Sequence, residues 1–169
     1  MSACYTRPID INIQHPTAED GFAVNQLIAE SPPLDTNSVY CNLLQCEHFA
    51  GTSVIAKAGD DVMGFISGYR IPARPEVLFV WQVVVSSRGR GQGLASRMLQ
   101  ALLDAEACRE VTHIETTITS DNEASWALFR KLADKLQAPT HSVVMFDHAT
   151  HFGGQHDSEQ LLRIGPFSH

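Results

Sequence analysis

The chain has 169 residues, of which 44% are hydrophobic and 18% charged, so we expect a single globular domain over residues 1–169. Its net charge of −7 disfavours nucleic-acid binding, because the phosphate backbone attracts extended basic surfaces. No apolar run approaches the roughly 20 residues of a membrane span, and residues 1–16 hold no apolar signal core. We therefore expect a cytoplasmic protein without a membrane partner, whose cysteines (Cys4, Cys41, Cys46 and Cys108) are reduced.

The first half of the chain predicts a strand, two helices and a hairpin. These elements are expected over residues 9–16, 17–30, 35–49 and 53–71. The strand alternates apolar and polar side chains and ends at Pro16. Asp35 or Thr36 is expected to cap the second helix, and residues 58–61 form the turn of the hairpin.

The second half predicts an alternation of strands and helices. The run at 76–85 is nearly all apolar, as expected for a central strand covered on both faces. From Leu94 to about Arg109 the apolar residues follow helical spacing. The remaining elements are a strand at 113–119, a helix at 120–136 with Ser120 and Glu123 at capping-box spacing, and strands at 140–147 and 160–167. This order combines hairpins with crossovers and predicts an α/β protein with a mixed sheet and helices on both faces.

A glycine-rich segment, SSRGRGQGLASRML at residues 86–99, joins the apolar strand to the helix that follows. A helix N-terminus presents free N–H groups and a partial positive charge, and glycines let an anion approach them. Arg88 and Arg90 add fork-shaped cationic donors. The segment therefore predicts a phosphate site. Leu94 stands where a P-loop or a dinucleotide fingerprint starting at Gly89 requires glycine, so we exclude both.

Arg88, Gly91 and Gly93 fill the pattern [RQ]-x-x-G-x-[GA], which resembles the acyl-CoA pyrophosphate loop of the GNAT N-acetyltransferases. The preceding strand, a helix opened by Asn122 and the order of elements are also similar to that family, over nearly the whole chain. The resemblance implies the GNAT acyl-CoA N-acyltransferase fold, with a mostly antiparallel central sheet, and acetyl-CoA as co-substrate without a metal. The residues that it implies for cofactor binding are Val83, Val84, Val85, Arg88, Gly89, Arg90, Gly91, Gln92, Gly93, Leu94, Ala95, Asn122 and Phe129.

The same resemblance implies direct acetyl transfer to an amine in a ternary complex. The amine must lose a proton, a backbone N–H of the strand near residues 81–85 must stabilise the oxyanion, and the thiolate needs a donor. The family often places a tyrosine for the last role where this chain has Phe129, which leaves the general acid open. The candidate bases are Glu76, Glu115, His156 and Glu159, each of which is individually also explained by a surface or structural role.

Four stretches, at residues 31–56, 64–85, 116–133 and 150–164, resemble one branch of the family, the L-2,4-diaminobutyrate acetyltransferases. This resemblance implies acetylation of the N4 amine of L-2,4-diaminobutanoate, a step in ectoine biosynthesis, by a homodimer. A substrate with two ammonium groups needs carboxylates, and Trp81 would offer a cation–π face. The candidate substrate-binding residues are Asp35, Thr36, Asn37, Ser38, Tyr40, Trp81, His156 and Glu159.

Three alternatives stay open at this point. A related enzyme of the same family would act on another small amine, such as a polyamine or an aminoglycoside. A non-catalytic domain would keep the fold and bind CoA as a sensor. A metal site at His148, His151 and His156 is disfavoured because the spacing matches no zinc signature, and one at Cys41, Cys46 and His48 because cysteines five residues apart lie on different faces of a helix.

Overall fold

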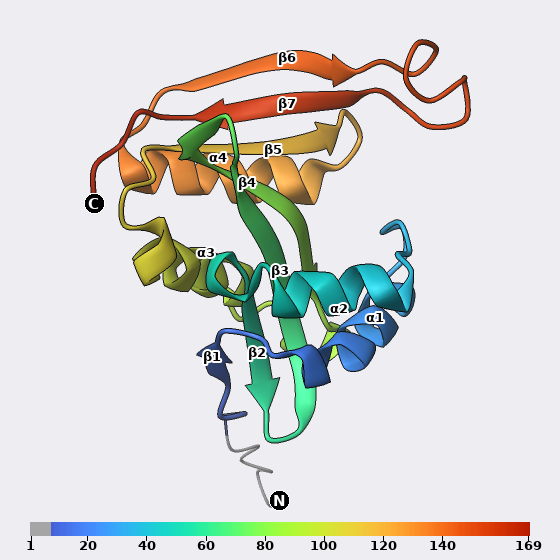
Figure 1. Ribbon diagram of the computed structural model, residues 1–169, viewed down its shortest axis with the longest axis vertical. Helices are drawn as coiled ribbons and strands as arrows, with labels where there is room; N and C mark the ends of the chain where they lie inside the picture. Colours follow the sequence, from blue (N-terminus) through green and yellow to red (C-terminus); the bar gives the residue numbers. More distant parts are fainter. Residues whose placement is uncertain (1–7) are drawn as a thin grey trace, which may run out of the picture.

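The computed structural model describes residues 8–169. Within this range seven strands form one sheet in the order β1-β2-β3-β4-β5-β7-β6 (Figure 1), in which β4 and β5 are parallel and the other neighbours antiparallel. The strands are β1 (Asn12–Gln14), β2 (Val54–Ala58), β3 (Asp61–Ile71), β4 (Arg74–Val85), β5 (His113–Thr119), β6 (Thr140–Phe146) and β7 (Glu159–Ile164). The helices are α1 (Gly21–Ala29), α2 (Val39–Glu47), α3 (Leu94–Asp104) and α4 (Glu123–Leu136). The predicted order of elements and the mixed sheet are confirmed.

Two hydrophobic cores lie on opposite faces of this sheet. The larger core packs α3 and α4 against strand residues such as Ile66 and Ile114. The smaller core packs α1 and α2 against Ile55 and Phe65. Neighbouring residues such as Phe65 and Ile66 enter different cores because successive side chains of a strand point to opposite faces. Helices therefore cover both faces, as the sequence predicts.

A β-bulge in β4 exchanges the two faces of that strand halfway along its length. Ser67 of β3 pairs with Gln82 and Gly68 pairs with Val80, so Trp81 is an extra residue. Before the bulge, Val80 faces the larger core; after it, Val84 faces the smaller core. One inserted residue reverses the alternation, since the side-chain period of a strand is two.

Strands β4 and β5 separate just before this bulge. Within the described chain they pair only over Val77–Phe79 and His113–Glu115. Thr116 Oγ1 still donates to the carbonyl oxygen of Val80 at 2.9 Å, but the later residues of both strands diverge. In Figure 1, β5, β7 and β6 lie together at the top beside α4, whereas β1 and β2 lie in the lower half. The divergence leaves an opening in the middle of the sheet.

Three predicted helix boundaries are wrong. Ser38, rather than Asp35 or Thr36, caps α2, and its Oγ accepts from the backbone N–H of Cys41 at 3.1 Å. Asn122 caps α4, as the family resemblance implies, whereas the capping box at Ser120 and Glu123 is wrong; Asn122 Oδ1 accepts from the N–H of Ser125. Helix α3 ends at Asp104, because the chain becomes extended at the next residue and then buries Cys108 in a short 3-10 turn.

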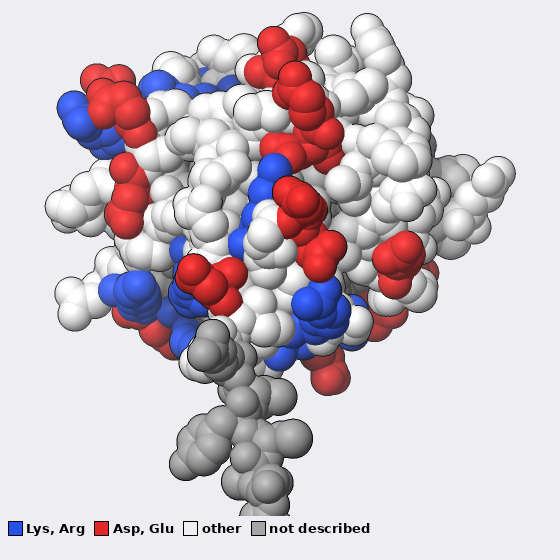
Figure 2. Space-filling model, turned by 90° about the horizontal axis from the view of Figure 1, so that it is seen from below, with Lys and Arg blue, Asp and Glu red and all other residues white. Residues whose placement is uncertain are grey.

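The surface of the described residues mixes both signs of charge. On the face seen in Figure 2, acidic and basic side chains are interspersed rather than sorted into patches of one sign. Among residues 8–169, no helix combines the length and the apolar character that crossing a membrane requires.

Candidate active site

A cleft with a volume of about 1270 Å³ lies where β4 and β5 diverge. Its walls come from the loop between α1 and α2, from β4 after the bulge, from the end of β5 and from the first turns of α3 and α4. Residues 156–159, which lead into β7, complete it. Figure 1 shows the α1–α2 loop and the β6–β7 loop on the same side of the molecule, where they border this cleft.

The N-terminus of α3 forms one wall of the cleft. Gly93, at the N-cap position of this helix, is in the left-handed conformation (φ 67°) and has no side chain to occupy the helix end. Gly91 is also left-handed (φ 75°). A Cβ at either glycine would meet no described atom within 4 Å, so the approach to the helix is open. The first intrahelical bond from this turn is donated by Arg97 N to Gly93 O, which leaves the preceding N–H groups of Leu94, Ala95 and Ser96 without helical acceptors. These three residues line the cleft and form an anion cradle.

The two arginines of the glycine-rich segment point in different directions. Arg90 lines the cleft, whereas the exposed Arg88 pairs with Asp61 at 3.0 Å outside it. Gln92 also lies outside the lining and donates to the carbonyl oxygen of Arg88. Gly89 lines the cleft and is tightly packed, since a Cβ there would lie 3.1 Å from Met63 O. Lys131 of α4, which the sequence did not single out, adds a second cation to the lining.

The other residues expected to bind the cofactor lie along the cleft. Val83, Val84 and Val85 use one backbone edge to pair with β3, and their other edge faces the separated β5. Asn122 opens α4 at the cleft wall. Phe129 also lines the cleft although only 2% of its surface is exposed.

An acidic group of residues borders the opposite side of the cleft. Asp35, Asp157 and Glu159 all line it, and His156 Nε2 lies 3.4 Å from Asp35 Oδ2, across the two loops. A hydrogen bond to the backbone oxygen of Asp157 raises the pKa of His156, and the nearby carboxylates raise it further. Burial raises the pKa of Glu159, whose buried Oε2 has no hydrogen-bond partner among the described residues. One oxygen of the Glu159 carboxyl group is thus without a hydrogen-bond partner beside the cleft.

Two of the four candidate bases lie elsewhere. Glu115, 2% exposed, is held by a bidentate pair with Arg74 (2.7 and 3.0 Å) and by Arg163 at 2.8 Å. Burial alone would raise the pKa of Glu115, but these arginines outweigh it and lower the pKa. Glu76 is exposed at the far end of β4. We therefore retain only His156 and Glu159 as candidate bases.

The predicted substrate-binding residues also fall into two groups, those that line the cleft and those that lie outside it. Asp35, Asn37, Trp81, His156 and Glu159 line the cleft. The structure places three others outside its lining: Thr36 is exposed, Ser38 caps α2, and Tyr40 is 69% exposed on that helix.

Gln82 lines the cleft and was missed by the sequence analysis. The signal was present, because Gln82 is the single polar residue within the apolar run VLFVWQVVV. Its neighbour Trp81 is 45% exposed and meets Tyr69 edge-on, with ring centroids 6.0 Å apart. The bulge therefore presents an aromatic and an amide side chain at the cleft instead of two core residues.

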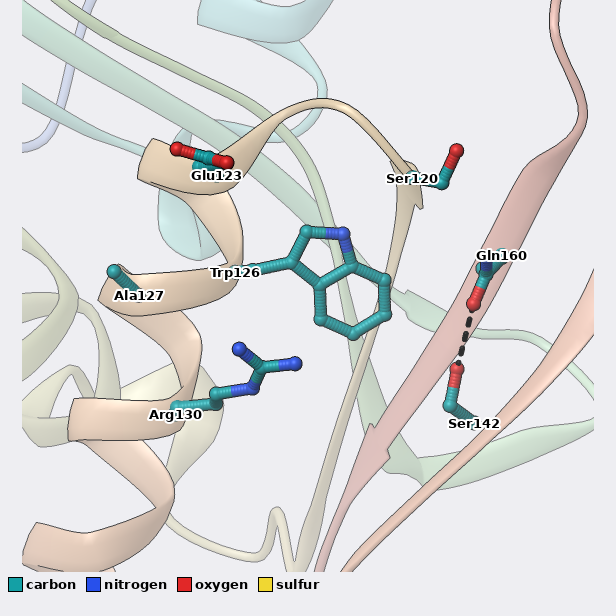
Figure 3. A pocket seen from close by; sticks show the side chains of 7 residues that line it. All are labelled: Ser120, Glu123, Trp126, Ala127, Arg130, Ser142 and Gln160. Carbon is teal, nitrogen blue, oxygen red and sulfur yellow. Dashed lines mark hydrogen bonds between the residues drawn. The ribbon is translucent and has the colours of Figure 1, made fainter.

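A smaller pocket of about 550 Å³ lies on another side of α4 (Figure 3). Trp126 occupies its centre, donates from Nε1 to Thr119 O and carries the Arg130 guanidinium 5.2 Å from its ring centroid. Ser142 and Gln160 bond to each other on the opposite wall. The lining of this pocket includes neither the glycine-rich N-terminus of α3 nor the acidic residues Asp35, Asp157 and Glu159, so we place the candidate site in the larger cleft.

The described residues contain no group of three or more His, Cys, Asp or Glu side chains arranged to hold a metal ion. His148 and His151 instead bond within their own loop, to His156 O at 2.6 Å and to the backbone N–H of Asp147 at 2.8 Å. Cys41 and Cys46 are free thiols on α2, and Cys4 lies outside the described residues.

Comparison with known proteins gives concordant results. The profile of the acetyltransferase (GNAT) family matches residues 22–133. The chain is 56% identical to an L-2,4-diaminobutyric acid acetyltransferase of Methylotuvimicrobium alcaliphilum, over 93% of this chain and 91% of the relative. It is 53% identical to one of Vibrio parahaemolyticus, with 89% and 83% covered.

Solved structures agree with these relatives. The diaminobutyrate acetyltransferase EctA of Paenibacillus lautus, in complex with its substrate L-2,4-diaminobutyric acid and coenzyme A, superposes with a TM-score of 0.91 at 40% identity. The alignment covers 96% of this chain and 98% of that one. The ribosomal-protein-S18-alanine N-acetyltransferase of Escherichia coli, at 14% identity, shares the fold with a TM-score of 0.71 over 95% of this chain and 96% of its own.

Proposed function

The chain belongs to the GNAT acetyltransferase family, and on that basis we propose that it transfers the acetyl group of acetyl-CoA to the N4 amine of L-2,4-diaminobutanoate. One observation carries the proposal: a single cleft is lined both by an anion cradle and by the carboxylates of Asp35, Asp157 and Glu159. An anionic cofactor and a substrate with two ammonium groups need these two environments side by side. The product would feed ectoine biosynthesis.

The residues present fit an acyl-CoA. The open left-handed glycines and the free N–H groups of Leu94, Ala95 and Ser96 suit a diphosphate, and Arg90 adds a positive charge. The edge of β4 that faces β5 offers backbone groups to an amide-bearing arm, in the manner of an added strand. Acetyl-CoA, when bound, supplies an activated thioester carbon. All other tasks fall to the side chains and backbone of the cleft.

Glu159 is the group best suited to accept the proton of the substrate amine. An alkylammonium has a pKa of about 10 and no lone pair until it is deprotonated. The raised pKa of Glu159 brings this carboxylate nearer to the range in which a general base works, and its free Oε2 has an acceptor position available. Asp35 and Asp157 would pair with the remaining positive charge.

Direct transfer is supported by the state of the described cysteines. Burial raises the pKa of Cys46 to about 12 and that of Cys108 to about 11, so neither is a ready nucleophile. Cys41 lies on α2 outside the cleft lining. Phe129 lines the cleft and cannot donate a proton, so we propose that thiolate departure uses no phenolic acid at this position.

We also propose that the enzyme is a cytoplasmic homodimer. The free thiols of Cys41, Cys46 and Cys108 suit a reducing compartment. Edge strand β6 exposes four consecutive apolar side chains, Val143, Val144, Met145 and Phe146, at 37–53%, an arrangement that favours association. Light scattering after size exclusion should give twice the mass of the chain.

A substrate panel tests the proposed reaction. Purified enzyme with acetyl-CoA should release thiol rapidly with L-2,4-diaminobutanoate and slowly with putrescine or an aminoglycoside, and NMR of the product should locate the acetyl group on N4. Equal turnover of putrescine would overturn the choice of substrate. Tight CoA binding without thiol release from any amine would instead indicate a sensor.

A further inference from the structure

A chain of hydrogen bonds, made by side-chain amides and the backbone oxygen of Asn37, runs from the buried interface of α1 and α2 to the cleft. Asn42 and Gln45, 0% and 1% exposed, bond to each other at 2.9 Å. Asn25 Nδ2 donates both to Asn42 Oδ1 at 2.9 Å and to the backbone oxygen of Asn37 at 2.8 Å. Asn37 Nδ2 in turn donates to Gln82 Oε1 at 2.9 Å. The chain therefore joins two helices, the loop between them and strand β4.

Backbone carbonyls fix the direction of each amide in this chain. Asn37 O can only accept, so the NH₂ group of Asn25 faces it. Asp35 O also can only accept, and it receives a longer bond of 3.4 Å from Gln82 Nε2. Gln82 Oε1 is then left facing Asn37 Nδ2. Gln82 thus accepts from one residue of the loop and donates to another two positions earlier.

The bulge at Trp81 is what turns Gln82 toward this loop. Without the extra residue, position 82 would share a face with Leu78 and Val80, which point into the core under α3 and α4. With it, Gln82 shares the face of Val84, whose side chain packs against α1 and α2. The same insertion therefore opens the cleft wall and points an amide at the segment that carries Asp35.

We propose that Gln82 is a positioning residue whose carboxamide clamps the Asp35–Asn37 segment to β4 and thereby holds the Asp35 carboxylate in place for the substrate ammonium. This inference rests on the proposed function for the identity of the substrate. The Asp35 side chain is 81% exposed, and among residues 8–169 the one polar contact that orders it is His156 at 3.4 Å. A shift of the loop would break the bonds that the half-buried amides of Asn25 and Gln82 make to Asn37, and this cost stabilises one loop position.

The first test compares Gln82→Met with Gln100→Met. Methionine has a similar length but removes both bonds of the clamp, whereas Gln100 donates to Asp104 on α3, outside the cleft. We expect Gln82→Met to raise KM for diaminobutanoate about tenfold, with kcat and KM for acetyl-CoA within threefold of wild type. Gln100→Met should change none of these values. An unchanged KM for diaminobutanoate in Gln82→Met would overturn the proposal.

The second test separates positioning from direct contact with the substrate. In an Asp35→Asn background, Gln82→Met should change KM less than twofold, since its effect passes through Asp35. An equal tenfold rise in both backgrounds would show that Gln82 acts independently of Asp35, and would refute the clamp. Asn37→Ala repeats the test from the other side of the bond if Gln82→Met folds poorly.

Hydrogen exchange of the free protein tests the clamp without any substrate. Amides of residues 34–38 should exchange faster in Gln82→Met than in wild type or Gln100→Met, and equal exchange would overturn the inference. If the wild-type enzyme fails to acetylate diaminobutanoate, the proposed function fails, but this measurement still decides whether Gln82 holds the loop.

Discussion

Replacing Gly91 by glutamate tests the anion cradle directly. Gly91 lines the cleft and is left-handed (φ 75°), with no described atom within 4 Å of an added Cβ. Gly59, in the β2–β3 turn, is likewise left-handed (φ 61°) and open, but lies outside the cleft. Gly91→Glu and Gly59→Glu therefore introduce the same charge at equal strain, and differ only in whether a diphosphate would lie beside it.

The expected magnitudes separate strain from charge. A side chain in the left-handed conformation costs about 1–2 kcal/mol, so both variants should lose that much unfolding free energy. Two unit charges about 6 Å apart at an effective dielectric constant of about 20 repel by about 3 kcal/mol. Gly91→Glu should therefore raise the Kd for CoA about 100-fold, while Gly59→Glu leaves it unchanged.

Calorimetric titration with CoA and urea denaturation of both variants measure these two quantities. Wild-type affinity in Gly91→Glu would refute the assignment of the cradle and with it the placement of the cofactor. Equal weakening in Gly59→Glu would attribute the effect to a general loss of stability.

Three further predictions concern the carboxylates. Glu159→Gln should lower kcat/KM for diaminobutanoate about 100-fold. In the wild type, protonation of Glu159 lowers activity as the pH falls through its raised pKa, and the variant should lack this decline; an unchanged pH–rate profile would exclude Glu159 as the base. Asp35→Ala should raise KM for diaminobutanoate about tenfold without changing CoA affinity, whereas loss of both would point to unfolding. Glu115→Gln should cost about 3 kcal/mol at pH 7, because Arg74 and Arg163 lose their partner. Folding lowers the pKa of Glu115, so its ion pairs contribute their full stabilisation above the unfolded-state pKa of 4.5. This stabilisation is lost as the pH falls below 4.5, and urea titrations in acid should therefore show the unfolding free energies of the variant and the wild type converging.

The sequence by itself determined the order of the elements and predicted the anion cradle at the start of α3. Apolar periodicity and turn residues indicated every strand and helix in the correct order, because these signals are local. The glycines at 91 and 93 indicated the cradle for the same reason, since backbone conformation and helix ends depend on neighbouring residues. The substrate could not be read from these signals, and came from resemblance to known relatives.

Only the tertiary structure decided which polar residues share the cleft. Glu115 and Glu159 lie at opposite ends of the adjoining strands β5 and β7, yet Glu115 is enclosed by two arginines whereas Glu159 keeps one buried oxygen without a described partner. Arg88 and Arg90 are two residues apart, but Arg88 pairs with Asp61 outside the cleft whereas Arg90 lines it. The bulge at Trp81 turns Gln82 toward the loop of Asp35, 47 residues earlier. Such contacts depend on strand register and on long-range packing. A single inserted residue shifts the register and turns the following side chains to the other face of the sheet.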